Sequence, residues 1–206
     1  MGGSEMVVFL PGRWSRVEEF EREGFFEIAR NRWPEARLVA ADLHLSYYLN
    51  RSMPQRLHED VILPARRSGV KKLTLVGVSM GGLGALIYEV DYPDEVDEII
   101  LLSPFVGDEK ALDEIAAAGN LKNWQPGVAD ERDFTRKLWL KLRVNWQIGG
   151  KRPKVLLGCG TEDRLAESNR LFAREFLNPS EQKWIPGTHD WPTWRPLFES
   201  LIGGNR

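Results

Sequence analysis

The chain has 206 residues, of which 42% are hydrophobic and 28% are charged, a balance that predicts one globular domain over residues 1–206 and excludes a disordered chain. The formal net charge of −2 and the isoelectric point near 6.0 exclude the basic surface typical of proteins that bind nucleic acids or anionic membranes, so we expect a small-molecule partner. The single cysteine, Cys159, excludes an internal disulfide, and the lack of a signal-like or membrane-length apolar run favours the cytoplasm.

Short apolar runs alternate with longer helical patterns along the chain. Strands are predicted over residues 6–10, 37–41, 72–76, 98–103, 154–158 and 182–186, and helices over residues 15–32, 54–67, 84–90, 165–177 and 191–202. Residues 42–53 are predicted to form a loop, and Pro64 predicts a kink near the end of the second helix. This alternation predicts an α/β fold with three layers, in which helices cover both faces of a mostly parallel six-stranded sheet. Ligands of such sheets bind beyond the carboxyl ends of the strands, where the winding direction reverses.

Residues 105–152 interrupt this alternation with two further helical patterns, over residues 109–118 and 130–146. Because folds of this type carry a cap after the fourth strand, we expect a helical, cap-like insertion here. Trp124 and Trp139 would give this insertion an apolar underside, and with Trp14 and Trp191 they are our candidate substrate-binding residues. The alternative is that the tryptophans of the insertion pack it onto the sheet.

Residues 77–81, between the third strand and the next helix, have the pattern Gly-x-Ser-x-Gly. This pattern is typical of a nucleophile elbow, a strained turn that exposes the serine, here Ser79, at the end of its strand. The amide of Met80 would then serve as an oxyanion donor, helped by the positive end of the helix. The stretch lacks the second glycine of a dinucleotide fingerprint and the Gly-Lys-Ser/Thr of a phosphate loop. We therefore expect neither a cofactor nor a metal.

A serine nucleophile needs a histidine base and a carboxylate, which follow it in this chain order in this type of fold. His189 is the one histidine after Ser79, and it comes directly after the last predicted strand. Asp163, after the fifth strand, is our candidate for the carboxylate. Glu162 is the local alternative, and Asp190 is a further one, although its side chain is expected to point away from the ring of its neighbour.

The second oxyanion donor is expected from the loop after the first strand, because an amide there would face Ser79 across the point where the winding direction reverses. This loop reads Pro11, Gly12, Arg13 and Trp14. Proline has no amide hydrogen, and glycine allows close approach of the backbone. The donor is therefore predicted to be Arg13 or Trp14, and the sequence leaves this choice open.

Five stretches together resemble the α/β-hydrolase superfamily: GVSMGGLGAL at residues 77–86, YP at 92–93, SP at 103–104, GTEDRL at 160–165 and GTHDWPTW at 187–194. Within the superfamily, the chain is most similar to serine esterases of the esterase D and mycolyltransferase-like group. The resemblance implies a triad of Ser79, Asp163 and His189 that hydrolyses an ester through an acyl-enzyme. It also implies a minimal core, because the antiparallel strands and the His-Gly oxyanion loop of larger members are missing.

The sequence thus predicts a serine hydrolase that cleaves a small carboxylic ester. Thioester cleavage and acyl transfer would use the same residues and remain alternatives. A non-catalytic ligand-binding protein with this fold is the alternative of a different class. The sequence does not predict the acyl chain, the alcohol portion or the oligomeric state.

Overall fold

The structure is a computed structural model that describes residues 3–127, 133–150 and 152–204. Its strands form one sheet in the order β2-β1-β3-β4-β5-β6, and every neighbouring pair among them is parallel. Their bounds are Glu5–Leu10 (β1), Arg37–Ala40 (β2), Lys72–Val78 (β3), Glu98–Leu102 (β4), Lys154–Gly160 (β5) and Gln182–Ile185 (β6). The winding direction reverses between β1 and β3, so the expected ligand site is at the carboxyl ends of these two strands.

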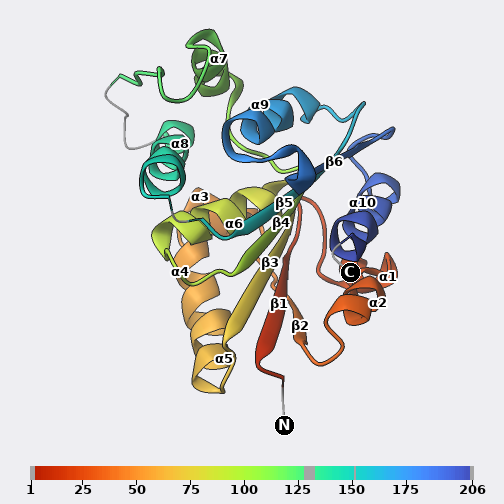
Figure 1. Cartoon of the computed structure of the whole chain (residues 1–206). Helices are drawn as coiled ribbons and strands as arrows, with labels where there is room; N and C mark the ends of the chain where they lie inside the picture. The colour runs from red at the N-terminus through yellow and green to blue at the C-terminus, as the bar shows by residue number, and fades with distance from the viewer. Residues whose placement is uncertain (1–2, 128–132, 151, 205–206) are drawn as a thin grey trace.

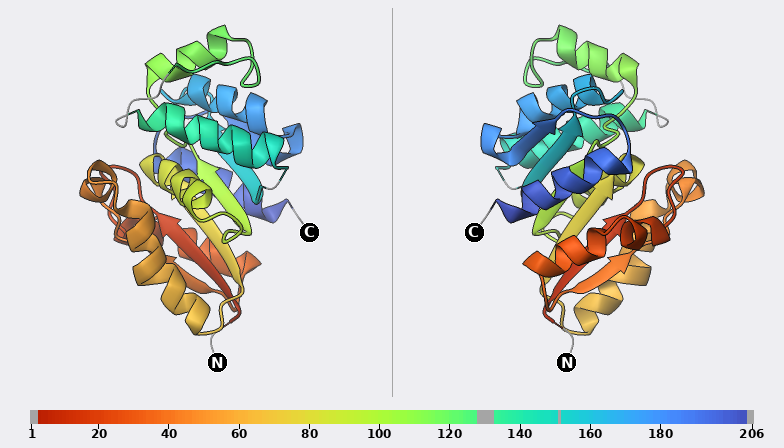
Figure 2. Two further views of the ribbon diagram at one scale, coloured as in Figure 1. Left: turned by 90° about the vertical axis from the view of Figure 1, so that its left-hand side faces the viewer. Right: turned by 90° about the vertical axis from the view of Figure 1, so that its right-hand side faces the viewer.

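Helices cover both faces of the sheet, which confirms the predicted three-layer α/β fold (Figure 1). One face carries α1 (Glu18–Arg22), α2 (Phe25–Arg32) and α10 (Trp191–Gly203). The other carries α3 (Leu45–Leu49), α4 (Met53–Leu57), η1 (His58–Ile62), α5 (Leu63–Arg67), α6 (Met80–Asp91), α8 (Phe134–Leu142), η2 (Arg143–Ile148) and α9 (Ala166–Phe176). The two panels of Figure 2 look onto these two faces. Helix α7 (Glu109–Ala117) lies outside this layer beyond α9, and the short η3 (Pro179–Glu181) leads into β6.

Alternate residues of each central strand enter the two separate cores. In β1, Met6, Val8 and Leu10 face the α6 side, whereas Val7 and Phe9 face the α10 side. The strands β3, β4 and β5 alternate in the same way, because successive side chains of a strand point to opposite faces. Both faces are apolar, as expected for a parallel sheet with helices on each side.

Two predicted boundaries on the first half of the chain were wrong. The helix predicted over residues 15–32 is divided into α1 and α2, because Gly24 adopts a left-handed backbone with φ of 78°. The loop predicted over residues 42–53 contains the single-turn helix α3. Its Tyr48 packs so closely on α6 that a Cβ at Gly84 would lie 2.4 Å from the tyrosine hydroxyl. Tertiary packing therefore holds a turn that has no side-chain N-cap of its own.

Two further predicted helices each contain a π-helical segment. In the helix predicted over residues 54–67, the π-turn η1 ends two residues before Pro64, which has no amide hydrogen and would clash with the carbonyl group of Asp60 in a regular helix. The helix predicted over residues 130–146 begins at Phe134, capped by Asp133, and continues through η2 to Ile148. Residues 130–132 lie outside the described residues.

Helix α8 and η2 pack on the same face of the sheet as α6. The rings of Trp139 and Trp146 contact those of Phe172 and Phe176 on α9. This part of residues 105–152 thus belongs to the helical layer between β4 and β5. No helix in the part of the chain that the structure describes is long and apolar enough to cross a membrane.

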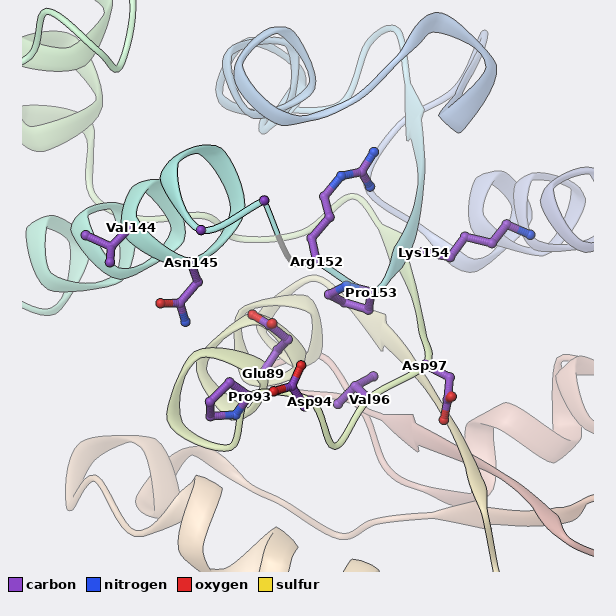
Figure 3. Close-up of a pocket in the computed structure, with 12 residues that line it drawn as sticks. Glu89, Pro93, Asp94, Val96, Asp97, Val144, Asn145, Arg152, Pro153 and Lys154 are labelled. Carbon is purple, nitrogen blue, oxygen red and sulfur yellow. The ribbon is translucent and has the colours of Figure 1, made fainter.

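A cavity of about 740 Å³ lies near the amino ends of β4 and β5, at the edge of the sheet opposite the predicted site (Figure 3). Its lining includes Glu89 of α6, which is only 3% exposed and accepts a hydrogen bond of 2.8 Å from the indole Nε1 of Trp146. Burial raises the pKa of Glu89 to about 7; the Trp146 hydrogen bond opposes this rise, and the nearby charge of Asp94 adds to it.

This raised pKa predicts that Glu89 makes the fold less stable at alkaline pH. The folded chain holds the Glu89 proton more tightly than the unfolded chain, so its contribution to stability is lost as the pH rises from about 4.5 through about 7. We expect Glu89→Gln, which can still accept the indole hydrogen bond, to raise the free energy of unfolding at pH 8 by on the order of 1–3 kcal/mol. Urea unfolding at pH 4.5 and pH 8 tests this. An equal gain at both pH values would contradict the assignment.

Candidate active site

Ser79 lies in the sharp turn between β3 and α6, with φ of 52° and ψ of −113°. Two glycines make this turn possible by close backbone contacts. A Cβ at Gly77 would lie 2.4 Å from the carbonyl oxygen of Gly81, and a Cβ at Gly81 would lie 1.9 Å from the carbonyl oxygen of Leu10. No side chain fits at either position, so the two glycines of the motif hold the serine in the strained conformation of an elbow.

The three residues that the sequence singled out lie in one hydrogen-bonded line. His189 Nε2 is 2.9 Å from Ser79 Oγ, and His189 Nδ1 is 2.8 Å and 2.9 Å from the two carboxylate oxygens of Asp163. A neutral imidazole with its proton on Nδ1 donates to Asp163 and accepts from the Ser79 hydroxyl at Nε2. Ser79 is 7% exposed, the Asp163 side chain is fully buried and the His189 side chain is 15% exposed. The arrangement can therefore draw a proton from Ser79 while remaining open to a ligand.

The carboxylate of Asp163 is kept charged by its surroundings. Burial acts to raise the pKa of this carboxyl group. The hydrogen bonds that it accepts from His189, from the Leu165 amide at 2.8 Å and from the Ser103 hydroxyl act the other way and prevail, so its pKa lies below its ordinary value. A charged Asp163 can hold the imidazole in the required tautomer and stabilise the imidazolium.

Ser103 supports this carboxylate, and the sequence analysis gave it no role. It is fully buried directly after β4, with φ of 44°, and its Oγ accepts a hydrogen bond of 3.0 Å from the indole Nε1 of Trp194. Its one proton can go to Asp163 or to the Cys159 sulfur at 3.6 Å, and the carboxylate is the stronger acceptor. The sequence signal that could have identified Ser103 was its position directly after the carboxyl end of a central strand, where the triad candidates also lie.

The two alternative carboxylates have other partners. Glu162 accepts a hydrogen bond of 2.9 Å from the Gly187 amide, and its own amide donates to the Gly187 carbonyl group. Asp190 caps α10 by accepting from the amide and the hydroxyl group of Thr193, and it also accepts from Thr188. The hydrogen bonds from Thr188 and Thr193 lower the pKa of Asp190. Both carboxylates therefore shape the loop that carries His189, and neither takes the place of Asp163 at the imidazole.

The Cys159 thiol and the imidazoles of His44 and His58 do not belong to this line of hydrogen bonds. Burial raises the pKa of the Cys159 thiol to about 12, so the thiolate needed for nucleophilic chemistry does not form at neutral pH. His58 hydrogen-bonds the Tyr88 hydroxyl, and His44 lies beside Ser46. Among the described residues, no group of three or more His, Cys, Asp or Glu side chains could hold a metal ion.

The loop after β1 passes directly beside the elbow. A Cβ at Gly12 would lie 3.5 Å from the Cβ of Ser79, so the backbone of this loop lies beside Ser79. Arg13 lines the cavity at Ser79, whereas the Trp14 side chain is 81% exposed and lies against the Arg13 guanidinium at 4.9 Å. Met80, the first residue of α6, is buried and lines the same cavity.

This cavity has a volume of about 650 Å³ and runs from Ser79 between α3 and α8. It does not include the four tryptophans predicted to bind substrate. Trp124 and Trp139 are buried in the core on the α6 side, where the Trp139 indole donates to the Val106 carbonyl group. Trp191 packs on Phe20 and Phe25 on the α10 side. The cavity wall instead comes from apolar residues of α3, α4, α6 and α8 and from Phe105.

Comparisons with known proteins agree with this architecture. A family model described as "Putative esterase" matches residues 42–202. The uncharacterized protein YjcH of Bacillus subtilis strain 168 is 26% identical over 132 residues, which are 63% of this chain and 47% of that protein, so the match spans about half the length of this relative.

Solved structures share the fold at low sequence identity. The S-formylglutathione hydrolase FrmB of Staphylococcus aureus matches with a TM-score of 0.66 and 18% identity over 97% of this chain and 79% of that chain. MPT51 (FbpC1) of Mycobacterium tuberculosis matches with a TM-score of 0.62 and 16% identity over 100% and 91% of the two chains. The fold is that of the α/β-hydrolases, and because the family model covers most of the sequence, the chain belongs to the "Putative esterase" family.

Proposed function

We propose that this protein is a serine hydrolase that cleaves a small carboxylic ester through an acyl-enzyme on Ser79. In this proposal His189 is the general base, and Asp163 orients its ring. The observation that carries the proposal is the unbroken line of hydrogen bonds from Ser79 through His189 to Asp163, at the end of a cavity with an apolar wall along α6. Membership of an esterase family supports the same reaction class.

The reaction begins with attack of Ser79 Oγ on the ester carbonyl carbon, while its proton passes to His189 Nε2. The amide of Met80 and the amino end of α6 stabilise the negative charge on the carbonyl oxygen, with a second amide from Arg13 or Trp14. Collapse of the tetrahedral intermediate breaks the bond to the alcohol oxygen, which takes the proton from Nε2. Water then attacks the acyl-enzyme by the same proton path, releases the acid and restores Ser79.

In this proposal, residues 1–206 form one α/β-hydrolase domain. Residues 105–152 are its cap-like insertion. Phe105, Phe134 and Leu138 line the cavity at Ser79 and would contact the apolar part of the ester. Helix α8 also packs in the helical layer on the sheet. We therefore assign the role of a cap only to the side of α8 that faces the cavity.

Labelling with a serine-directed fluorophosphonate tests the proposal. The folded protein should be labelled at Ser79, and peptide mapping by mass spectrometry would identify the site. The matched control is Ser46→Ala, which removes an exposed serine hydroxyl on α3 away from the triad, and it should leave Ser79 as the labelled residue. A folded protein that is not labelled at Ser79 and hydrolyses no ester would favour the ligand-binding alternative.

A further inference from the structure

The cavity at Ser79 has an apolar wall along α6. Leu83, Ile87 and Val90 line it at spacings of four and three residues, so they form one face of the helix. At 1.5 Å per residue, this face extends about 10 Å from Leu83 to Val90, leading away from Ser79. Leu45 and Tyr48 of α3 also line the cavity. This groove suits an apolar chain bonded to the carbonyl carbon at Ser79.

Three arginines, Arg13, Arg51 and Arg164, line the same cavity. Among the described residues, none of the three guanidinium groups forms an ion pair or a hydrogen bond with the protein, and Arg13 only lies over the Trp14 ring. The carboxylate among the described lining residues is Asp91, which is paired with Lys141 at the far end of the groove. Within the described part of the chain, this cavity thus holds positive charge that forms no ion pair, although the net charge of the whole sequence is −2.

The arginines come from three separate loops, and two of them adjoin the reacting groups. Arg13 follows Gly12, which packs against Ser79, and Arg164 follows Asp163, which is hydrogen-bonded to His189. Arg51 follows α3, with φ of 61°. In the proposed reaction the leaving alcohol oxygen must take its proton from His189 Nε2. The alcohol portion therefore lies on the His189 side, where Arg164 is.

We propose that the ester carries an anionic group, a carboxylate or a phosphate, on its alcohol portion, while its apolar acyl portion lies along α6. Guanidinium groups bind such groups through paired, charge-assisted hydrogen bonds. This inference rests on the proposed function, since it assigns the substrate class of the same site. Unlike that proposal, it predicts a preference that depends on substrate charge.

Three hexanoyl esters with similar benzylic leaving groups test the inference. Their alcohols are 4-(hydroxymethyl)benzoate, 4-(hydroxymethyl)phenyl phosphate and the neutral 4-(hydroxymethyl)benzamide. We expect kcat/KM for at least one anionic ester to exceed that for the carboxamide by roughly tenfold at low salt, and we expect this ratio to fall as salt screens the charges. The two anionic esters distinguish carboxylate from phosphate recognition.

Arginine variants assign the preference to this cavity. Arg51→Gln and Arg164→Gln should each lower the ratio of anionic to neutral kcat/KM. Arg67→Gln, which removes the same charge from an exposed position on α5 outside the cavity, should leave it unchanged. Equal kcat/KM values for all three esters, or a preference that persists in the double variant Arg51→Gln/Arg164→Gln, would overturn the inference. If Ser79-dependent hydrolysis of the neutral ester remains in that case, the proposed function stands. If no ester is hydrolysed and Ser79 is not labelled, both fail.

Discussion

Ser79→Ala should abolish ester hydrolysis, with a loss in kcat on the order of 10⁶, the size found when the nucleophile of a serine protease is removed. The change removes the attacking oxygen, and the alanine side chain has no nucleophilic atom to replace it. It also removes only one hydroxyl group, and alanine keeps the Cβ that the turn already accommodates, so the fold should persist. Steady-state hydrolysis of a chromogenic acyl ester, together with circular dichroism of the purified variant, measures both effects.

His189→Ala provides the matched test, because triad residues act as a unit and their losses are not additive. The single variant should lose activity by a factor comparable to that of Ser79→Ala. The double variant should be little slower than either single variant. If the double variant is much slower than both, the two residues do not work together, and substantial turnover by Ser79→Ala would refute the assigned nucleophile.

Asp163→Asn should lower kcat by about 10⁴, the loss measured for the equivalent change in a serine protease. Asparagine keeps the shape of the side chain, but its amide group favours the wrong imidazole tautomer. The variant also loses the negative charge that stabilises the imidazolium. In the unsubstituted protein, hydrogen bonds keep the pKa of Asp163 below its ordinary value, so this carboxylate is ionised. Comparison of kcat and KM on one ester should show the loss mainly in kcat.

Glu162→Gln and Asp190→Asn are the controls for this assignment. A glutamine at position 162 can still accept from the Gly187 amide, and asparagine at position 190 can still cap α10. Both variants should therefore retain most of the maximal rate. If one of them proves severe while Asp163→Asn stays active, the carboxylate has been assigned to the wrong residue, although the roles of Ser79 and His189 would survive.

The parts of the fold that the sequence predicted are those that local chemistry determines. The central strands were recognisable because both of their faces are apolar. The elbow was recognisable because its close backbone contacts admit only glycine at positions 77 and 81. The fold class is confirmed, while the catalytic roles of Ser79, Asp163 and His189 stay predictions that the geometry supports.

The features that the sequence did not predict depend on distant contacts. Helix α3 is one turn long and is held by packing of Tyr48 on α6, which leaves little periodic signal in its own sequence. Trp124 and Trp139 are apolar in either setting, so their positions did not reveal whether they pack the core or line a cavity. Ser103 accepts a hydrogen bond from the indole of Trp194, 91 residues away, and no local sequence pattern indicates this partner.

The distance along the chain between Ser79 and His189 has a consequence for synthesis. In the proposed mechanism, the nucleophile Ser79 lies between β3 and α6, but its base His189 comes 110 residues later, on a loop that is placed only when β6 pairs with β5. Because the ribosome makes the chain from its amino end, the central strands can begin to associate around a serine that still lacks its base. We therefore expect the proposed activity to appear only after β6 has paired with β5, when nearly all of the described sheet has assembled.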